Sequence, residues 1–289
     1  VFVGLIKKGQ RFFLGIRQLY RSSVWTTALI MFIMTLTFLN LVVISGILVG
    51  LIEGGNIANR NQYTGDVIIT KRAGDPAIER TPEILATLEE MPSVTKYSAR
   101  YIKGGSIEAN YKLRKDFNAL PDTVGGQVAG IDIAKENELS NIAKYVVEGR
   151  FLDPEMGGEV VMGSNMLRRF SSAFGDGFDS LDGVYPGDMV KITVGERTKE
   201  FRVVGIVKSK VGEVSFRAYM NMNDYRTLTD ASNLNASEIA IVHDASVTDD
   251  TLKASLATRF ESGAKIQTAT EAIPQFLNDI KTAFSLLGN

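Results

Sequence analysis

The chain has 289 residues, with 32 lysines and arginines against 33 aspartates and glutamates, a formal net charge of −1, no cysteine and a single histidine. The absence of cysteine excludes disulfides, cysteine nucleophiles and cysteine-ligated metal sites. A domain of this size can bury enough apolar surface to fold without disulfides.

Residues 1–23 form a basic leader without an acidic residue, and its charges are Lys7, Lys8, Arg11, Arg17 and Arg21. Apolar residues recur between them at three- and four-residue steps, a pattern typical of an amphipathic helix at a membrane surface: Phe12, Phe13, Ile16, Leu19 and Tyr20. Alternatively, the leader extends the next helix into the lipid headgroups. A short basic segment beside an apolar one favours anionic lipid over nucleic acid as its partner.

Residues 24–52 contain no charged side chain. As a helix rising ~1.5 Å per residue, they exceed the ~30 Å hydrocarbon core of a bilayer. A cleaved secretory signal has an apolar region of only about 7–15 residues, and a buried helix of a soluble domain is rarely apolar on every side. We therefore predict a retained transmembrane helix. Within it, Asn40 indicates a helix–helix contact or, alternatively, a substrate path.

The charges on the two sides of this helix predict its orientation. The basic leader precedes it, and the first charges that follow are Glu53 and Arg60. By the positive-inside rule the N-terminus lies in the cytoplasm and residues beyond about 55 lie outside. We predict a protein of the inner, cytoplasmic membrane whose main domain is extracytoplasmic or periplasmic.

The region from about residue 60 is long enough for one large domain or two small ones. Its first part predicts a helix over 81–91, with Thr81 as N-cap and Pro82 as the first helical residue. The glycines in residues 94–108 (VTKYSARYIKGGSIE) suggest strand, turn and strand. The other predicted elements of this part are strands at 65–71 and 127–132 and a helix at 138–147.

The second part predicts a hairpin from the alternating residues 188–194 and 200–208. It also predicts strands at 159–162, 214–222, 238–243 and 265–268, and helices at 163–174, 222–228, 248–260 and 270–287. Hairpins mixed with helices favour an α+β fold over a doubly wound parallel sheet.

We find no residues with a recognisable catalytic arrangement. His243 stands beside Asp244 at the end of a strand, and we expect it to be exposed there. Asp176, Asp179 and Asp182 recur at every third residue, unlike the alternate spacing of an EF-hand, which favours a solvated loop over a calcium site. Residues 4–9 (GLIKKG) lack the lysine of a phosphate-binding loop. We predict no catalytic, cofactor-binding or metal-binding residue and no ATPase activity in this chain.

The order of these parts resembles ABC-transporter permeases of the MacB/LolC/FtsX type, and the likeness is strongest to the MacB-like periplasmic core domain. The basic entry to the span and the first strand carry part of it, in residues 17–22 (RQLYRS) and 65–70 (GDVIIT). Further stretches in the same order are residues 149–152 (GRFL), 158–167 (GEVVMGSNML), 187–194 (GDMVKITV) and 201–208 (FRVVGIVK).

The resemblance implies a division of the chain. Residues 1–23 would be the cytoplasmic leader, 24–52 the first span and 53–269 the extracytoplasmic core, with lobes at roughly 60–150 and 151–269. Residues 270–289 would be a stalk helix leading to a second span. Permeases of this type have four spans, so we expect the sequence to be a fragment that stops before the second one.

The resemblance also implies a function without catalysis by this chain. A separate cytosolic ABC ATPase would drive a pair of permease subunits, the second copy being identical or different. Their outer domains would export or release an amphiphile such as a lipoprotein, peptide or antibiotic. Membrane lipid and an extracytoplasmic adaptor would be further partners. The alternatives are an FtsX-like regulator that activates a cell-wall hydrolase, and a membrane-anchored enzyme or binding domain.

Overall fold

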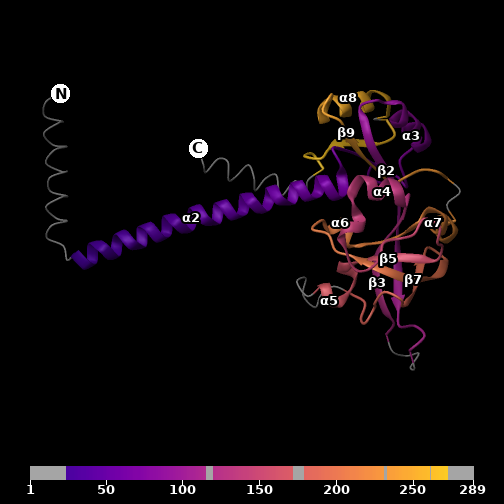
Figure 1. Cartoon of the computed structure of the whole chain (residues 1–289), viewed down its shortest axis with the longest axis horizontal. Helices are drawn as coiled ribbons and strands as arrows, with labels where there is room; N and C mark the ends of the chain where they lie inside the picture. The colour runs from indigo at the N-terminus through magenta and orange to yellow at the C-terminus, as the bar shows by residue number, and fades with distance from the viewer. Residues whose placement is uncertain (1–23, 115–119, 172–178, 231–232, 261, 273–289) are drawn as a thin grey trace. The chain divides into compact units, whose positions relative to one another are not determined.

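The computed structural model describes residues 24–114, 120–171, 179–230, 233–260 and 262–272, which form the α+β fold expected from the sequence (Figure 1). Two compact units divide the chain between Glu53 and Gly54. The first unit contains most of helix α2 (Val24–Asn59), and the second, Gly54–Asn278, contains the sheet. The leader at 1–23 and residues 273–289 of the expected stalk lie outside the described residues.

Helix α2 carries no charged side chain before Glu53. Its large side chains are exposed along its length, Phe38 and Leu51 each by 68%. Thr37 satisfies its hydroxyl within the helix, donating a hydrogen bond to the carbonyl of Ile33 at 2.8 Å. Of the helices in the described part of the chain, α2 alone is long and apolar enough to cross a membrane. An unbroken apolar surface of this kind suits contact with lipid.

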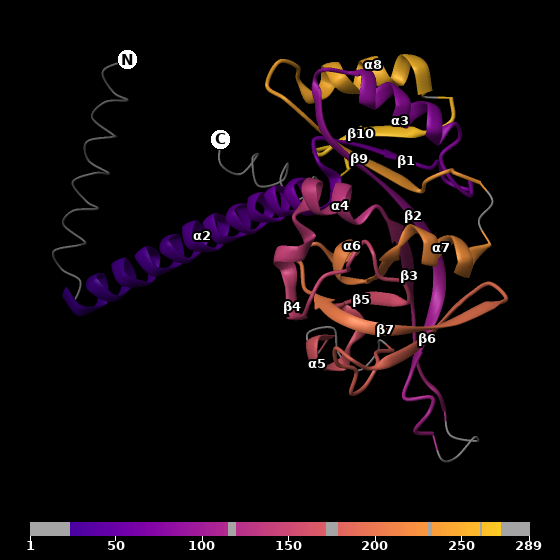
Figure 2. The same cartoon turned by 45° about the vertical axis from the view of Figure 1, so that its right-hand side comes forward.

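One part of the sheet has the ferredoxin-like order β10-β1-β9-β2, with every neighbouring pair antiparallel. Helices α3 and α8 cover it, as Figure 2 shows at the top of the view. Their apolar faces pack on the strands around Ile69, Ile84, Ile241 and Leu256. The elements of this part are β1 (Val67–Thr70), α3 (Thr81–Glu90), β2 (Val94–Ala109), β9 (Glu238–His243), α8 (Asp249–Phe260) and β10 (Lys265–Thr268).

The segment between β2 and β9 builds the rest of the sheet. Its pairings return to β2 through β6 and so close a ring in the order β2-β3-β8-β5-β7-β6. Apolar residues of these strands, among them Ile107, Val160 and Phe201, pack into one core. The strands are β3 (Asp122–Ile131), β5 (Glu159–Gly163), β6 (Met189–Val194), β7 (Arg197–Val207) and β8 (Arg217–Asn221), and β4 (Val146–Gly149) pairs with β7.

Short helices complete this second unit: η1 (Arg60–Thr64), α4 (Ile133–Ser140), η2 (Ile142–Tyr145), η3 (Ser164–Met166), α5 (Arg168–Ser171), α6 (Gly212–Ser215) and α7 (Met222–Thr229). A third apolar cluster lies among η1, α4 and α6 and includes Ala58 from the end of α2. The lobe limits of 60–150 and 151–269 stay a prediction. Apolar packing groups the residues differently. One core lies mainly among the strands and helices on either side of the segment between β2 and β9, and another lies mainly within that segment.

Several elements lie where the sequence predicts them, including β1, β9 and β10, the β6–β7 hairpin, and helices α7 and α8. The turn expected within residues 94–108 is wrong, because β2 continues as one strand from Val94 to Ala109. Gly105 serves close packing there: a Cβ on it would lie 2.6 Å from the carbonyl oxygen of Thr193.

Two helix predictions are wrong in position, and the N-cap predicted for α3 is wrong although the helix itself lies where the sequence predicts it. Helix α4 starts earlier than 138 because Asp132 caps it, its Oδ1 accepting from the amide of Lys135 at 3.0 Å. Arg80, with φ of 56°, precedes α3 in place of Thr81, whose hydroxyl bonds to Ile78 and Ala236. The helix expected over 163–174 is only η3 and the short α5 up to Ser171, where residues 172–178 lie outside the described part.

The strand expected over 214–222 begins later than predicted. The hydroxyl of Ser215 accepts from the amide of Ser209 at 3.0 Å and donates to its carbonyl at 3.1 Å. These bonds hold a helical turn, α6, over Gly212–Ser215, and β8 starts only at Arg217.

Candidate functional site

Helix α2 enters the sheet unit through a π-helical turn. Residues Arg60–Thr64 form η1 directly after Asn59, and the amide of Gly65 donates to the carbonyl of Arg60 at 3.0 Å. Gly65 has φ of 64°, and a Cβ there would lie 2.4 Å from the carbonyl oxygen of Ile241. Only glycine therefore allows the chain to leave the turn against β9. Single π turns recur at functional sites in helices.

Tyr63 in this turn contacts two buried arginines. The guanidinium groups of Arg100 and Arg217 each lie over its ring, 5.1 Å from the centroid. Arg100 Nη1 also donates to the Tyr63 carbonyl at 2.8 Å, and the Tyr63 hydroxyl donates to Glu238 Oε1 at 2.7 Å. Backbone, ring and hydroxyl of one residue are thus all held, which fixes the orientation of the turn on the sheet.

Two carboxylates neutralise the two arginines. Arg100 makes a two-pronged ion pair with Glu136, at 2.8 and 2.9 Å, and Arg217 makes one with Glu238, at 3.0 and 2.8 Å. The side chains of Arg100, Glu136 and Arg217 are at most 3% exposed. We call these four residues and Tyr63 the joint cluster. Its members come from η1, β2, α4, β8 and β9, so it links the turn to both parts of the sheet.

Charge pairing keeps the arginines and glutamates of the joint cluster ionised despite their burial. Burial alone raises the pKa of Glu136, but the charge and hydrogen bonds of Arg100, with bonds from Ser98 and Ser140, lower it below the ordinary value. Burial likewise opposes ionisation of Glu238, and Arg217 and Arg100 outweigh it and lower its pKa. Buried ion pairs of this kind contribute little net stability. Losing one partner leaves a buried charge without a counterion, which costs free energy, so the pairs favour the one geometry in which both partners meet.

A second group ties the turn to α8. Arg60 pairs with Asp66 at 2.7 Å and with Asp249 at 3.2 Å. His243 Nε2 lies 2.9 Å from Asp249 Oδ1, and Nδ1 lies 2.6 Å from the carbonyl of Asp244. The expectation of an exposed histidine is wrong, because its side chain is only 7% exposed. Since carbonyl and carboxylate oxygens only accept, these contacts favour the doubly protonated form of the ring.

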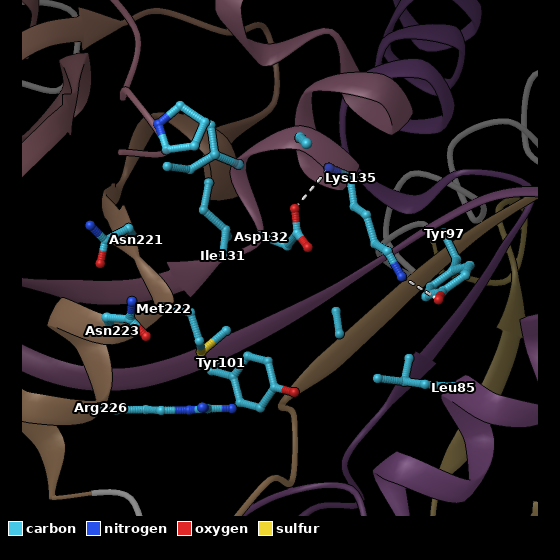
Figure 3. Close-up of a pocket in the computed structure, with 14 residues that line it drawn as sticks. Leu85, Tyr97, Tyr101, Ile131, Asp132, Lys135, Asn221, Met222, Asn223 and Arg226 are labelled. Carbon is cyan, nitrogen blue, oxygen red and sulfur yellow. Dashed lines mark hydrogen bonds between the residues drawn. The ribbon is translucent and has the colours of Figure 1, made fainter. Parts of the chain in front are cut away.

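A cleft of about 370 Å³ lies over β2 where α3, α4 and α7 approach it. Figure 3 shows Tyr101, Met222 and Ile131 around its middle, with Lys135 and Tyr97 on one side and Arg226 on the other. Its size and largely apolar lining suit a small ligand, since such sites commonly span ~300–1,000 Å³. The described lining contains no nucleophile–base pair.

The acidic loop predicted to be solvated is partly described. Asp182 pairs with Arg168 at 2.9 Å, Asp179 is exposed, and Asp176 lies outside the described residues. Within the described ranges no group of three His, Cys, Asp or Glu side chains is placed to hold a metal ion.

Sequence reasoning did not identify the joint cluster. The available signal was a charged residue inside an otherwise apolar strand, as with Arg100 in residues 97–102 and Arg217 in residues 214–220. Such positions need a buried partner of opposite charge. Which carboxylate supplies it depends on the sheet order, because Glu136 and Glu238 are distant from each other in the chain.

The family model described as the MacB-like periplasmic core domain matches residues 27–276. No curated protein matches the chain.

Three solved structures resemble it. The periplasmic region of MacB from Actinobacillus actinomycetemcomitans is 13% identical, with a TM-score of 0.50, and the match covers 78% of this chain and 95% of that one. The extracellular domain of the noncanonic ABC-type transporter YknZ from Gram-positive bacteria is 12% identical, with a TM-score of 0.44 and coverage of 70% and 99%. A domain of a putative permease protein from Porphyromonas gingivalis is 12% identical, with a TM-score of 0.43 and coverage of 74% and 95%. The first of these supports the fold.

Proposed function

Because the chain belongs to the MacB-like periplasmic core domain family of ABC-transporter permeases, we propose that it is the membrane subunit that couples a separate cytosolic ABC ATPase to movement of an extracytoplasmic domain. The substrate is an amphiphile that is exported or released on the outer side. The chain supplies no catalytic group of its own. Hydrolysis of ATP belongs to the partner, and a second permease subunit completes the complex.

The observation that carries this proposal is the joint cluster. A helix fit to cross a membrane ends in a π turn, and four other elements of the sheet unit hold that turn through buried charges. A loosely attached anchor would need no such contacts. A structure that must transmit displacement needs a joint with a defined geometry, and bidentate arginine–carboxylate pairs provide one.

The mechanism follows from these contacts. The partner ATPase changes the arrangement of the membrane helices when it binds ATP, and α2 carries that change to η1. Tyr63 then shifts together with Arg100 and Arg217, because their contacts resist independent motion. Since Arg100 lies in β2, which belongs to both parts of the sheet, the displacement reaches both. The cytoplasmic N-terminus, the outer position of residues 53–269 and the stalk at 270–289 are parts of this proposal.

The first test identifies the partner. The full-length gene product that contains this chain is tagged, solubilised from membranes of its own cell in mild detergent and captured, and its companions are identified by mass spectrometry. An ABC ATPase recovered in near-stoichiometric amount is the expected result. Capture of a cell-wall hydrolase with an ATPase would support the regulator alternative and overturn export. Absence of any ATPase would contradict the proposal.

A further inference from the structure

Arg226 in the cleft described above is a charge without a counterpart. It is exposed on α7 and has no hydrogen bond or ion pair within the described part of the chain. In Figure 3 its side chain extends beneath Met222 toward Tyr101. We propose that the cleft binds a single-chain amphiphile with an acidic head group, which Arg226 contacts while the apolar chain lies along β2.

The other charged groups of the cleft already have partners. Lys135 donates to the Tyr97 hydroxyl and pairs with Glu89 at 3.3 Å. Asp132 accepts from the backbone amide at the start of α4. Asp132 keeps its negative charge on the α4 side of the cleft, and Arg226 on α7 gives the opposite side an excess of positive charge. A guanidinium prefers carboxylate or phosphate oxygens, with which it forms charge-assisted hydrogen bonds.

The space between the two charged sides is apolar. Ala99 and Ile131 are buried beneath it, and Tyr101, Ile133 and Met222 line it. Methionine adapts to chains of different shape. An alkyl chain would therefore make apolar contacts beside Arg226. A fully polar anion would cover the same apolar side chains without the free energy of burying an apolar chain against them. The adjacent amide of Asn223, also exposed, can donate to the same head group.

This inference deepens the proposed function and rests on it only for the view that the ligand is transported cargo. Binding itself follows from Arg226 and the apolar lining. The two ideas can therefore fail separately. A chain that binds the acidic amphiphile but captures no ATPase overturns the transport proposal alone. A chain that captures an ATPase without binding the amphiphile overturns only the cleft.

The test uses the full chain in lipid nanodiscs with a polarity-sensitive dye. Because the chain has no cysteine, Ala134→Cys in the cleft lining gives a unique labelling site, and Ala254→Cys on α8 gives a site outside the cleft. Octanoate is titrated against octyltrimethylammonium and octyl glucoside, which share its chain but not its charge. Arg226→Gln is compared with Arg259→Gln, an exposed arginine on α8 that serves as matched control.

We expect a saturable change at the Ala134 label with octanoate, at least fivefold tighter than with either control amphiphile, and none at the Ala254 label. Arg226→Gln should weaken octanoate binding about tenfold, the usual effect of losing one charge-assisted contact, while Arg259→Gln leaves it unchanged. Equal binding of the cationic amphiphile, an unchanged affinity in Arg226→Gln, or no saturable response to octanoate would each overturn the site.

Discussion

His243, Asp66, Asp249 and Arg60 form a small electrostatic group in which one histidine carries the variable charge. Two carboxylates and one carbonyl surround the imidazole, and Arg60 is the only cation paired with these carboxylates in the described residues. Protonated His243 therefore adds attraction between β9, the residue before β1 and the first turn of α8. At this scale the structure predicts a pH dependence that the sequence alone did not.

Burial by itself lowers the pKa of His243, but the carbonyl of Asp244 and the carboxylates of Asp249 and Asp66 raise it above the ordinary 6.5. A histidine with a raised folded pKa contributes stability that is complete below the unfolded pKa, near 6.5, and is lost as pH rises through the folded pKa. The chain has one histidine, so the Hε1 proton of its imidazole gives a single NMR resonance. We expect that resonance to titrate with a midpoint above 6.5.

Asp249→Asn supplies the control for this titration. It removes one carboxylate that favours the protonated ring and should move the midpoint down. A wild-type midpoint at or below 6.5 would contradict the arrangement around His243.

Among the elements, β2 is the strand on which the two parts of the sheet depend. It pairs with β9 along its first half, with β6 near its end and with β3 from Arg100 onward. Because β2 continues through Gly104 and Gly105, the strand that contains Arg100 and the cleft residues Tyr97 and Tyr101 also pairs with β6 and closes the ring. An interruption there would break the pairing of β2 with β6.

Gly105→Ala tests this continuity. The added Cβ would lie 2.6 Å from the Thr193 carbonyl oxygen, so β6 must shift away from β2. We expect the free energy of unfolding to fall by about 1–3 kcal/mol, the usual cost of overpacking, when measured by urea denaturation of the chain in nanodiscs.

The neighbouring Gly104→Ala is the matched control, because a Cβ at Gly104 meets nothing within 4 Å. Its free energy of unfolding should stay within about 0.5 kcal/mol of the wild type. Equal effects of the two alanines would show that β2 and β6 are not packed as described.

The sequence predicted elements whose signals are local. Alternation located β6, β7 and β9, and the long uncharged run located α2. The prediction failed at β2, where two glycines indicated a turn. Gly105 instead allows β6 to approach closely, and a single sequence cannot distinguish a turn glycine from a packing glycine without knowing which strand is paired there. The joint cluster and the cleft could not be predicted for the same reason. Arg100, Glu136, Arg217 and Glu238 meet through sheet order, which single-sequence periodicity does not contain.

At the scale of the whole molecule, the proposed function makes the chain the connection between ATP hydrolysis by the partner and movement of an outer domain. The family, the apolar helix and the joint cluster are three independent observations that support the proposed function. Tyr63 lies in the turn that directly follows α2 and is a member of the joint cluster. Tyr63→Ala removes the hydrogen bond to Glu238 and both arginine contacts with the ring, while the two arginine–glutamate pairs remain. It should therefore uncouple the domain without unfolding it.

The most direct measurement is energy transfer between a dye on Ala254→Cys and labelled lipid headgroups, in nanodiscs that contain the full complex with its ATPase. If α2 and the joint cluster transmit movement, the transfer efficiency changes when the ATPase is trapped with ATP and vanadate. We expect a smaller change in Tyr63→Ala at an unaltered rate of ATP hydrolysis, and a wild-type change in Tyr185→Ala, an exposed tyrosine outside the joint cluster. The same efficiency with and without ATP in the wild-type complex would show that the outer domain does not move with the ATPase.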